Sequence, residues 1–294
     1  MDAWPALPYP DWRDTCATLQ LWTQIVGKIR LVQTPWVNHS WHVAYYVTAR
    51  GLTTSPMPYG TRVFEIDFDF IDHRLLIKTG EGQMRTLQLE PQTVADFYRA
   101  VLGELSGLGI DIAINTMPCE LAGAIRFEDD RQHHAYDKDA VRRFLGALLQ
   151  ADRVLKEFRS RFRGKCSPAH FFWGSFDLAV TRFSGRPAPE HPGGVPHLPD
   201  RVVREAYSHE VLSAGFWPGN DALPQPAFYA YAYPEPAGFA TARVGPAAGF
   251  YHPDLHEFIV PYDAVRQADS PDAALLEFLQ QTYEVGARLA RWNV

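Results

Sequence analysis

Residues 64–70 alternate strictly between apolar and acidic side chains, in the order Phe-Glu-Ile-Asp-Phe-Asp-Phe. This period of two predicts a strand with Glu65, Asp67 and Asp69 on one face and the apolar side chains on the other. Neighbours on one strand face are roughly 7 Å apart, so three ionised carboxylates need water, a cation or a metal ion beside them. We refer to these three residues as the acid stripe.

Four segments combine the apolar spacing of a helix with suitable terminal residues. The predicted helices cover residues 11–31, 93–109, 137–164 and a final segment from 270 onward. Thr93 followed by Asp96 resembles a capping box, and Asp137 is a good N-cap for the longest helix. Ser270 and Pro271 provide a cap and a first helical residue for the last one.

Nine segments rich in aromatic and β-branched residues predict strands, at 41–49, 63–70, 74–78, 84–89, 110–114, 171–173, 176–183, 227–233 and 257–260. The Pro- and Gly-rich stretch 184–199 is predicted to be an irregular surface loop. Strand meanders flanked by helices indicate an α+β fold rather than a doubly wound parallel sheet.

The order of the predicted elements divides the chain near Asp137. Each part contains a predicted helix, then several predicted strands, then another predicted helix. This order predicts an N-terminal α+β half at 1–136 and a C-terminal α+β half at 137–294. Two degenerate repeats packed as one unit and a single compact domain are both open interpretations. The similarity between Val-Thr-Ala-Arg at 47–50 and Val-Thr-Arg at 180–182 is too short to decide.

Composition limits the kind of protein. With 294 residues, 46% of them hydrophobic and 21% charged, the chain can bury the core of one large or two ordinary domains. No apolar run approaches the ~20 residues of a membrane helix, so we expect no membrane partner. The first residues lack a secretory signal and the three cysteines are odd in number, which favours a cytoplasmic location. A net charge of −6 argues against nucleic-acid binding.

Three long strings carry a resemblance to a known family. They run from Trp41-His42-Val43 to Thr54-Ser55-Pro56, from Gly164-Lys165-Cys166 to Ser184-Gly185-Arg186, and from Tyr207-Ser208-His209 to Trp217-Pro218-Gly219. With them the chain resembles, nearly from end to end, a bacterial family known as domain of unknown function 5996. The resemblance implies no activity, cofactor or site residue, so the candidate residues are inferred from their own chemistry.

The first candidate constellation joins His39 and His42 to the acid stripe. On a turn or helix, two His three residues apart can reach one ion, whereas on a strand they face opposite ways. If the strand that carries His42 pairs with the acid stripe, imidazole and carboxylate converge as in mixed N/O sites for iron, manganese or zinc. The alternative is that the acids face solvent or pair with arginines, namely Arg50, Arg62, Arg74 or Arg85.

Two further constellations involve His. A turn at Gly174-Ser175 would place His170 and Asp177 on facing strands, and an Asp beside a His is a general-base or ligand-orienting arrangement. Cys166, four residues before His170, is a weaker candidate nucleophile, because a lone Cys is more often a small buried hydrophobe. His209 follows Tyr207 and Ser208, and its alternative is an ordinary loop His.

These stretches share a composition of His and acids among Trp, Tyr and Phe, which is typical of ligand pockets. The leading hypothesis is a cytosolic metal-dependent or acid–base enzyme acting on a small, partly apolar molecule in an aromatic, His-lined pocket. The alternatives are a metal-free small-molecule binding or sensing protein without catalysis, and a structural partner protein. The sequence contains no Gly-rich phosphate loop, dinucleotide fingerprint, Gly-x-Ser-x-Gly, His-Glu-x-x-His or Cys-x-x-Cys motif.

The hypothesis assigns roles by residue type. The predicted catalytic residues are His170, Asp177 and His209. The predicted ligands of a divalent iron, zinc or manganese ion are His42, Asp67, His170 and His209. The predicted substrate-binding residues are Arg50, Tyr59, Trp173, Arg182 and Trp217, in which the arginines would hold an anionic group by bidentate hydrogen bonds.

Overall fold

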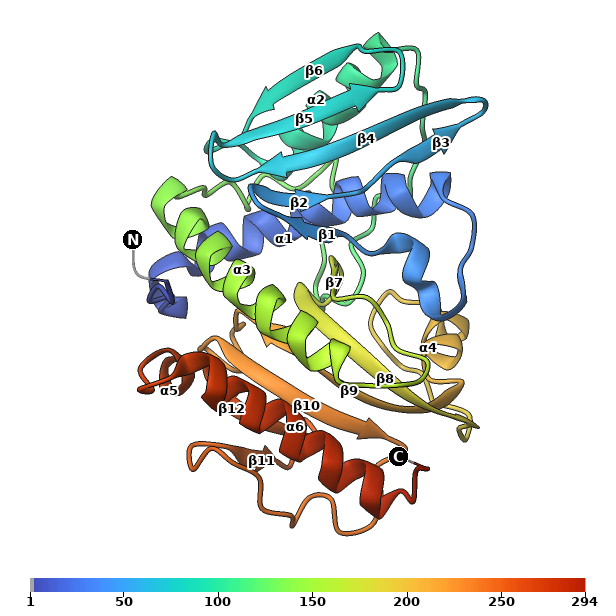
Figure 1. Cartoon of the computed structure of the whole chain (residues 1–294). Helices are drawn as coiled ribbons and strands as arrows, with labels where there is room; N and C mark the ends of the chain where they lie inside the picture. Colours follow the sequence, from blue (N-terminus) through green and yellow to red (C-terminus); the bar gives the residue numbers. More distant parts are fainter. Residues whose placement is uncertain (1–2, 294) are drawn as a thin grey trace.

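The computed structural model describes residues 3–293 and has two antiparallel sheets with a long helix between them (Figure 1). The predicted α+β class is confirmed. Within the described residues, no helix has both the length and the apolar character needed to cross a membrane.

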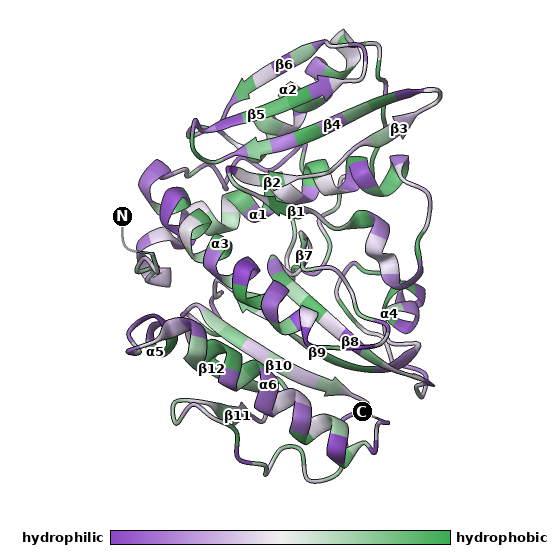
Figure 2. Ribbon diagram, viewed as in Figure 1, coloured by the Kyte–Doolittle hydropathy of each residue, from purple (hydrophilic) through white to green (hydrophobic). Residues whose placement is uncertain are grey.

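The first sheet is built from the N-terminal half of the chain. Its strands are β1 (Tyr46–Thr48), β2 (Gly51–Thr53), β4 (Arg62–Asp69), β5 (Arg74–Thr79) and β6 (Met84–Gln88) in this spatial order, and β3 (Met57–Tyr59) pairs with β4. Helix α2 (Val94–Gly107) begins at Thr93, whose hydroxyl accepts a hydrogen bond from the Asp96 N–H at 3.0 Å, as the capping-box pattern predicts. Apolar and polar residues alternate along β4 in Figure 2, so one of its faces is buried.

The second sheet is built from the C-terminal half. Its spatial order is β11 (Phe250–His252), β12 (Glu257–Pro261), β10 (Ala227–Tyr233), β9 (His209–Trp217), β8 (Asp177–Pro187) and β7 (His170–Phe172). The long helices α3 (Lys138–Ser160) and α6 (Pro271–Leu289) lie against this sheet (Figure 1), and the short helices are α4 (Asp200–Ala206) and α5 (Tyr262–Arg266). Asp137 caps α3 by accepting hydrogen bonds from two backbone N–H groups.

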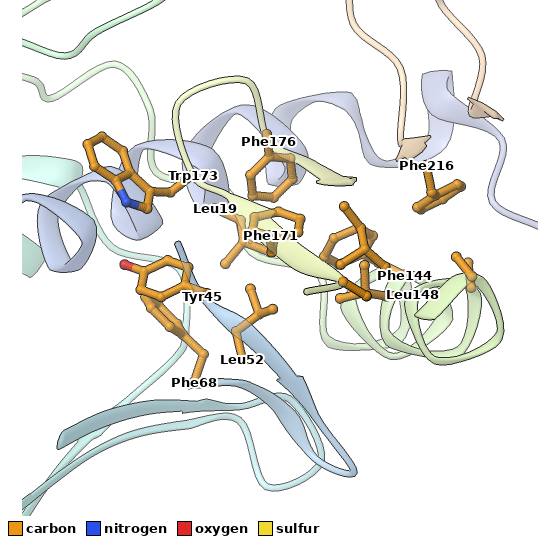
Figure 3. Packing of buried hydrophobic residues seen from close by; sticks show 14 of the residues in the cluster. Leu19, Tyr45, Leu52, Phe68, Phe144, Leu148, Phe171, Trp173, Phe176 and Phe216 are labelled. Carbon is orange, nitrogen blue, oxygen red and sulfur yellow. The ribbon is translucent and has the colours of Figure 1, made fainter. Parts of the chain in front are cut away.

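The two sheets are joined by backbone and by packing. Tyr45 and Phe171 exchange two backbone hydrogen bonds of 2.8 Å, which tie the start of the first sheet to β7. Side chains from both sheets, α1 and α3 belong to one hydrophobic cluster. In Figure 3, Leu19 of α1 and Phe171 of β7 lie in one group of apolar side chains with Leu52 of the first sheet and Phe144 of α3. Both halves therefore bury apolar surface against a common core.

Helix α1 (Tyr9–Gln33) lies at the centre of this core. Every residue from Leu21 to Arg30 is buried, so the helix has no solvent-facing stripe in this part. Several of its buried polar side chains bind other segments. Gln24 exchanges two hydrogen bonds with the backbone of Cys119, and Lys28 donates to the carbonyl of Met117 at 2.7 Å.

The predicted helices differ from the observed ones mainly at their ends. Helix α1 begins at Tyr9 after Pro8, so Asp11 lies in the first turn and is not the cap. Helix α3 ends at Ser160, four residues before Gly164. Ser270 occupies the N-cap position of α6, but its side chain makes no capping hydrogen bond.

Several strand predictions need correction. Residues 110–114 form no strand, and 41–43 belong to the short 3₁₀ segment η1 (Asn38–Val43), in which His39 and Ser40 both have a positive φ of 59°. Residues 184–187 continue β8 and are not part of the predicted loop. The central strand β9 was not predicted. The short elements β2, β3, β11, α4 and α5 were not predicted either, because short segments carry too little periodic signal to be recognised.

The contact between α1 and Trp173 yields a test of the fold. A Cβ atom on Gly27 would lie 2.4 Å from the indole ring of Trp173, whose Nε1 donates to the carbonyl of Val43 at 2.8 Å. We expect Gly27→Ala to lower the free energy of unfolding by about 1–3 kcal/mol through overpacking, as measured by urea denaturation.

The matched control for this substitution is Gly103→Ala in the exposed part of α2. No atom lies within 4 Å of the added Cβ at that position. Alanine is the better helix former, so this variant should gain up to about 1 kcal/mol. Equal effects of the two substitutions would contradict the packing described for Trp173.

Candidate functional site

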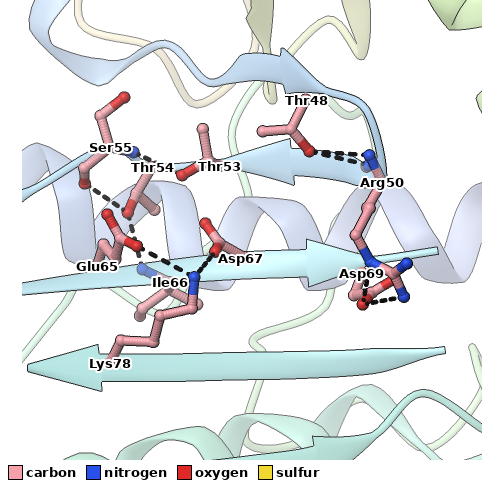
Figure 4. Close-up of polar contacts among 11 residues, drawn as sticks. Thr48, Arg50, Thr53, Thr54, Ser55, Glu65, Ile66, Asp67, Asp69 and Lys78 are labelled. Carbon is pink, nitrogen blue, oxygen red and sulfur yellow. Dashed lines mark hydrogen bonds and ion pairs between the residues drawn. The ribbon is translucent and has the colours of Figure 1, made fainter. Parts of the chain in front are cut away.

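The acid stripe lies on β4 and is neutralised by basic residues (Figure 4). The Nζ atom of Lys78, on the adjacent strand β5, lies 2.5 Å from Asp67 and 3.1 Å from Glu65. The predicted metal ligand Asp67 is thus held by an ammonium group. Lysine was absent from the predicted partners, although the register places Lys78 directly opposite Glu65.

Asp69, the third acid, forms an ion pair with Arg50. Pairing of the acid stripe with arginines was the alternative to a metal site. Arg50 lies 2.8 Å from Asp69 and 2.8 Å from Asp72, at the turn between β1 and β2. Burial opposes ionisation of Asp69, but hydrogen bonds from the Asp72 N–H, Arg50 and the Ile71 N–H hold its pKa below the ordinary value. Arg50 is therefore occupied in the first sheet and does not line a site with the predicted His residues.

Two of the predicted His ligands, His42 and His170, are buried. His42 accepts a hydrogen bond from the Val37 N–H at 3.3 Å, and burial lowers its pKa. His170 is fully buried, and neither ring nitrogen has a hydrogen-bond partner in the described residues. Burial, with a smaller effect from Arg159, lowers the pKa of His170 to about 3, so it carries no proton near neutral pH.

Three sequence stretches nevertheless meet in space at Trp41. The Trp41 ring lies 6.0 Å from His170 and 5.4 Å from His39, and His39 in turn lies 5.8 Å from His209. His209 begins β9, and its Nδ1 lies 3.0 Å from the hydroxyl of Ser208. The structure thus places Trp41, His170 and His209 near one another through ring contacts, with His39 between Trp41 and His209.

The predicted pair of His170 and Asp177 is not formed. His170 lies opposite Ala179 in the register of β7 and β8, whereas Asp177 lies opposite Phe172. The Asp177 carboxyl group instead accepts hydrogen bonds from the hydroxyls of Ser175 and Tyr229. A two-residue offset between the strands separates the two predicted partners.

Asp177 belongs to a different group, which we call the tyrosine–carboxyl cluster. Its members are ionisable side chains linked by hydrogen bonds or by electrostatic interaction: Glu120, Asp177, Tyr207, Tyr229, Tyr231 and Glu257. Tyr229 and Tyr231 stack with their ring centroids 6.1 Å apart, and the hydroxyls of Tyr207 and Tyr231 are 2.9 Å apart. Side-chain alternation places Tyr229, Tyr231 and Asp177 on the sheet face opposite Val180 and Arg182.

The carboxyl groups of this cluster hold protons unusually tightly. Burial raises the pKa of Glu120 to about 7 and that of Glu257 to about 8, and the charge of Asp177 adds to both shifts. Burial also raises the pKa of Asp177 itself. None of the three forms an ion pair within the described residues, so no cation offsets the cost of their ionisation.

Helix α1 positions the segments that carry two of these carboxyl groups. Gln24 holds the backbone of Cys119, directly before Glu120, and Gln20 donates to the carbonyl of Gly174 at 2.7 Å. A Cβ atom on Gly174 would lie 1.9 Å from Oε1 of Glu120, so the turn before Asp177 requires glycine to admit this side chain. Two glutamines one helical turn apart thus bring the loop of Glu120 to the turn of Asp177.

The remaining predicted binding residues are distributed over the molecule. Arg182 is fully buried on the α3 side of the second sheet, and its guanidinium lies 3.5 Å from the ring centre of Phe158. Tyr59 accepts a hydrogen bond from the Asp111 N–H at 3.1 Å, on the first sheet. Trp173 is a buried core residue. Trp217 lies next to the tyrosine–carboxyl cluster, because it packs against the small apolar cluster that contains Tyr229.

The predicted metal ligands do not form a common site. Within residues 3–293 no group of three or more His, Cys, Asp or Glu side chains is placed to hold a metal ion. A small cavity of about 120 Å³ lies elsewhere, between the start of β9, the end of β10 and the residues that follow α6, and is lined by residues such as Val211, Tyr233 and Trp292. The tyrosine–carboxyl cluster is therefore the strongest concentration of unusual chemistry.

Most of this cluster was missed in the sequence. The segment 227–233 was read only as a strand, although it places Tyr at 229, 231 and 233 between small Ala residues. That alternation is a recognisable signal for a tyrosine-lined face. Glu120 and Glu257 carry no such signal, because an isolated Glu in a loop or at a strand start is ordinarily exposed.

Comparison with known proteins assigns the chain to a family. The sequence model of DUF5996, a family of unknown function, matches residues 4–294. The chain therefore belongs to this family. No curated protein and no solved structure gives a significant match.

The raised pKa of Glu257 makes stability depend on pH. Between the ordinary pKa of a glutamate, 4.5, and the folded-state pKa of about 8, the folded state binds more protons than the unfolded state, so stability falls as pH rises through this window. Glu257→Gln, which mimics the protonated acid, should therefore stabilise the protein more at ~pH 9 than at ~pH 5 in urea denaturation. The exposed residue Glu90 gives the control, Glu90→Gln, and an equal effect of Glu257→Gln at both pH values would contradict the assignment.

Proposed function

We propose that this member of the DUF5996 family is an enzyme that performs acid–base chemistry on a small, partly apolar molecule at the tyrosine–carboxyl cluster. The observation that supports the proposal most directly is the presence of three carboxyl groups with raised pKa values and no ion-pair partner in the described residues. Strongly perturbed carboxyl groups concentrate at functional sites, since proton transfer needs a pKa near the working pH.

The members of the cluster have complementary roles in this proposal. Glu120, with a pKa of about 7, exchanges a proton readily near neutral pH, and Glu257, with a pKa of about 8, is mostly a proton donor there. The hydroxyls of Ser175 and Tyr229 orient the carboxyl group of Asp177. Glu120, Glu257, Tyr207 and Tyr231 are only half-buried, so solvent and a ligand can reach them.

The aromatic surroundings favour a partly apolar substrate. Tyr229 belongs to a separate small apolar cluster with Ala227 and Ile259, and Trp217, Leu223 and Tyr231 pack around it. An apolar wall beside a few polar groups is the usual composition of a small-molecule site. The substrate would thus contact rings with one part and the carboxyl groups with another.

The alternative is a binding protein that uses the same cluster without catalysis. It is favoured by the pairing of Tyr207 with Tyr231 and of Tyr229 with Asp177, which already satisfies these hydroxyls. Stacked rings next to carboxyl groups can hold a ligand without transferring a proton. An enzyme would convert the bound molecule into a product, whereas a binding protein would release it chemically unchanged.

Proton exchange with solvent provides a general test of acid–base chemistry. The protein is incubated in D₂O with a defined mixture of small carbonyl compounds and amines, and proton NMR follows the replacement of C–H hydrogens and the formation of products. We expect at least one compound to react, and Asp177→Asn to slow that reaction by about 100-fold or more, as expected when a general acid or base loses its function.

Asp152→Asn is the matched control for this experiment. Asp152 is also a buried Asp whose pKa is raised by burial, but it lies on α3 and pairs with Lys156 at 2.6 Å. This variant should keep the activity of the original protein. A reaction that proceeds equally well in Asp177→Asn would refute the proposal, and a compound that binds without reacting would favour the binding protein.

A further inference from the structure

A second candidate reactive group, formed by Lys165 and His39, lies near the start of β9. The Nζ atom of Lys165 lies 2.6 Å from Nε2 of His39. The other ring nitrogen of His39, Nδ1, lies 3.1 Å from the backbone carbonyl of Glu205. A carbonyl oxygen only accepts hydrogen bonds, so Nδ1 carries the proton and Nε2 offers its lone pair to the lysine.

The position of His39 is fixed by an unusual backbone. His39 and the next residue, Ser40, both have a positive φ of 59°, which is uncommon for residues other than glycine. The His39 N–H also donates to the side chain of Glu205 at 3.2 Å. Such conformations cost free energy and are found where the surroundings enforce them, often at functional sites.

Lys165 differs from the other lysines in its surroundings. The chain has five lysines, at positions 28, 78, 138, 156 and 165. Lys28 binds a backbone carbonyl, and Lys78 and Lys156 bind carboxylates, which favour the charged ammonium. Lys165 instead has an imidazole acceptor, and burial lowers its pKa although the charge of Glu205 acts in the other direction.

Aromatic rings surround the amine on two sides. The Nζ atom lies 4.7 Å from the ring centre of Phe183 and 5.7 Å from that of Trp41. The titratable groups that face this arrangement are His39 from η1, Glu205 from α4 and His209 from β9. Lys165 is nevertheless exposed, so a molecule from solvent can reach the amine.

We propose that Lys165 is a nucleophilic amine that forms an imine with small aldehydes or ketones, with His39 as the group that accepts and returns the proton. The arrangement combines an accessible amine, a neutral base in hydrogen-bond contact and two rings that can hold the apolar part of the carbonyl compound. Asp177 and Phe183 are six positions apart on β8, roughly 20 Å, so Lys165 lies away from the Asp177 carboxyl group, and the part of the cluster nearest in sequence is Tyr207, two residues after Glu205.

The reaction needs no oxidant or reductant. The lone pair of Nζ forms a bond to the carbonyl carbon, and the electron pair of the C=O π bond moves to the oxygen. Nε2 of His39 takes a proton from the nitrogen and returns it to the oxygen, which gives a carbinolamine. Nε2 of His39 then takes the remaining proton from the nitrogen and delivers it to the hydroxyl, which leaves as water while the nitrogen lone pair forms the C=N bond. Amine and carbonyl compound thus give imine and water.

Reductive trapping tests the proposal on the unmodified protein. The protein is treated at ~pH 7 with benzaldehyde and sodium cyanoborohydride, which reduces an imine to a stable secondary amine, and peptide mass analysis measures the initial rate at each lysine. We expect Lys165 to react at least about fivefold faster than the exposed Lys138, because the imidazole of His39 contacts its amine and can accept the proton. Equal rates at Lys165 and Lys138 would overturn the proposal.

A His39→Gln variant tests the role of the imidazole. Glutamine can still accept a hydrogen bond from Lys165 but cannot take up a proton at neutral pH. We expect the Lys165 rate to fall at least about threefold, within the usual range for loss of a proton acceptor, while the Lys138 rate stays unchanged. An unchanged Lys165 rate would refute the role of His39, and a parallel change at both lysines would show that the variant acts through general unfolding.

Discussion

The burial of α1 on all sides is the constraint on which the rest of the structure depends. A helix with no exposed stripe between Leu21 and Arg30 must place its polar side chains against other segments, because an unpaired buried polar group is costly. Gln20 and Gln24 meet this requirement by binding the backbone at Gly174 and Cys119. The same bonds that make the helix compatible with the core therefore fix the two segments that carry Asp177 and Glu120.

The tyrosine–carboxyl cluster follows from this arrangement and from the second sheet. The face of the sheet that carries Tyr229 and Tyr231 provides hydroxyls and rings but no cation for the adjacent acids in the described residues. Burial without a nearby cation raises the pKa of each of these carboxyl groups, to about 7 for Glu120 and about 8 for Glu257. The acid stripe shows the opposite outcome, because Lys78 and Arg50 face it.

The sequence predicted the α+β class, the N-caps Thr93 and Asp137, and the strand 227–233 with its observed ends. These features depend on local periodicity and capping chemistry. The site was predicted less well, since it depends on strand register and on loops brought together by α1. Asp177 and Trp217 were among the predicted residues, whereas Glu120, Glu257 and the tyrosines were not, because no local pattern shows that these groups meet.

The protonation of the cluster is the central claim, and carboxyl titration measures it directly. Carbon-13 NMR of protein labelled at the Asp and Glu carboxyl groups would follow Glu120, Asp177 and Glu257 through neutral pH, with assignments from single variants. The structure predicts midpoints of about 7 for Glu120 and about 8 for Glu257, together with a raised midpoint for Asp177. Midpoints near the ordinary value of about 4 for all three groups would contradict the account.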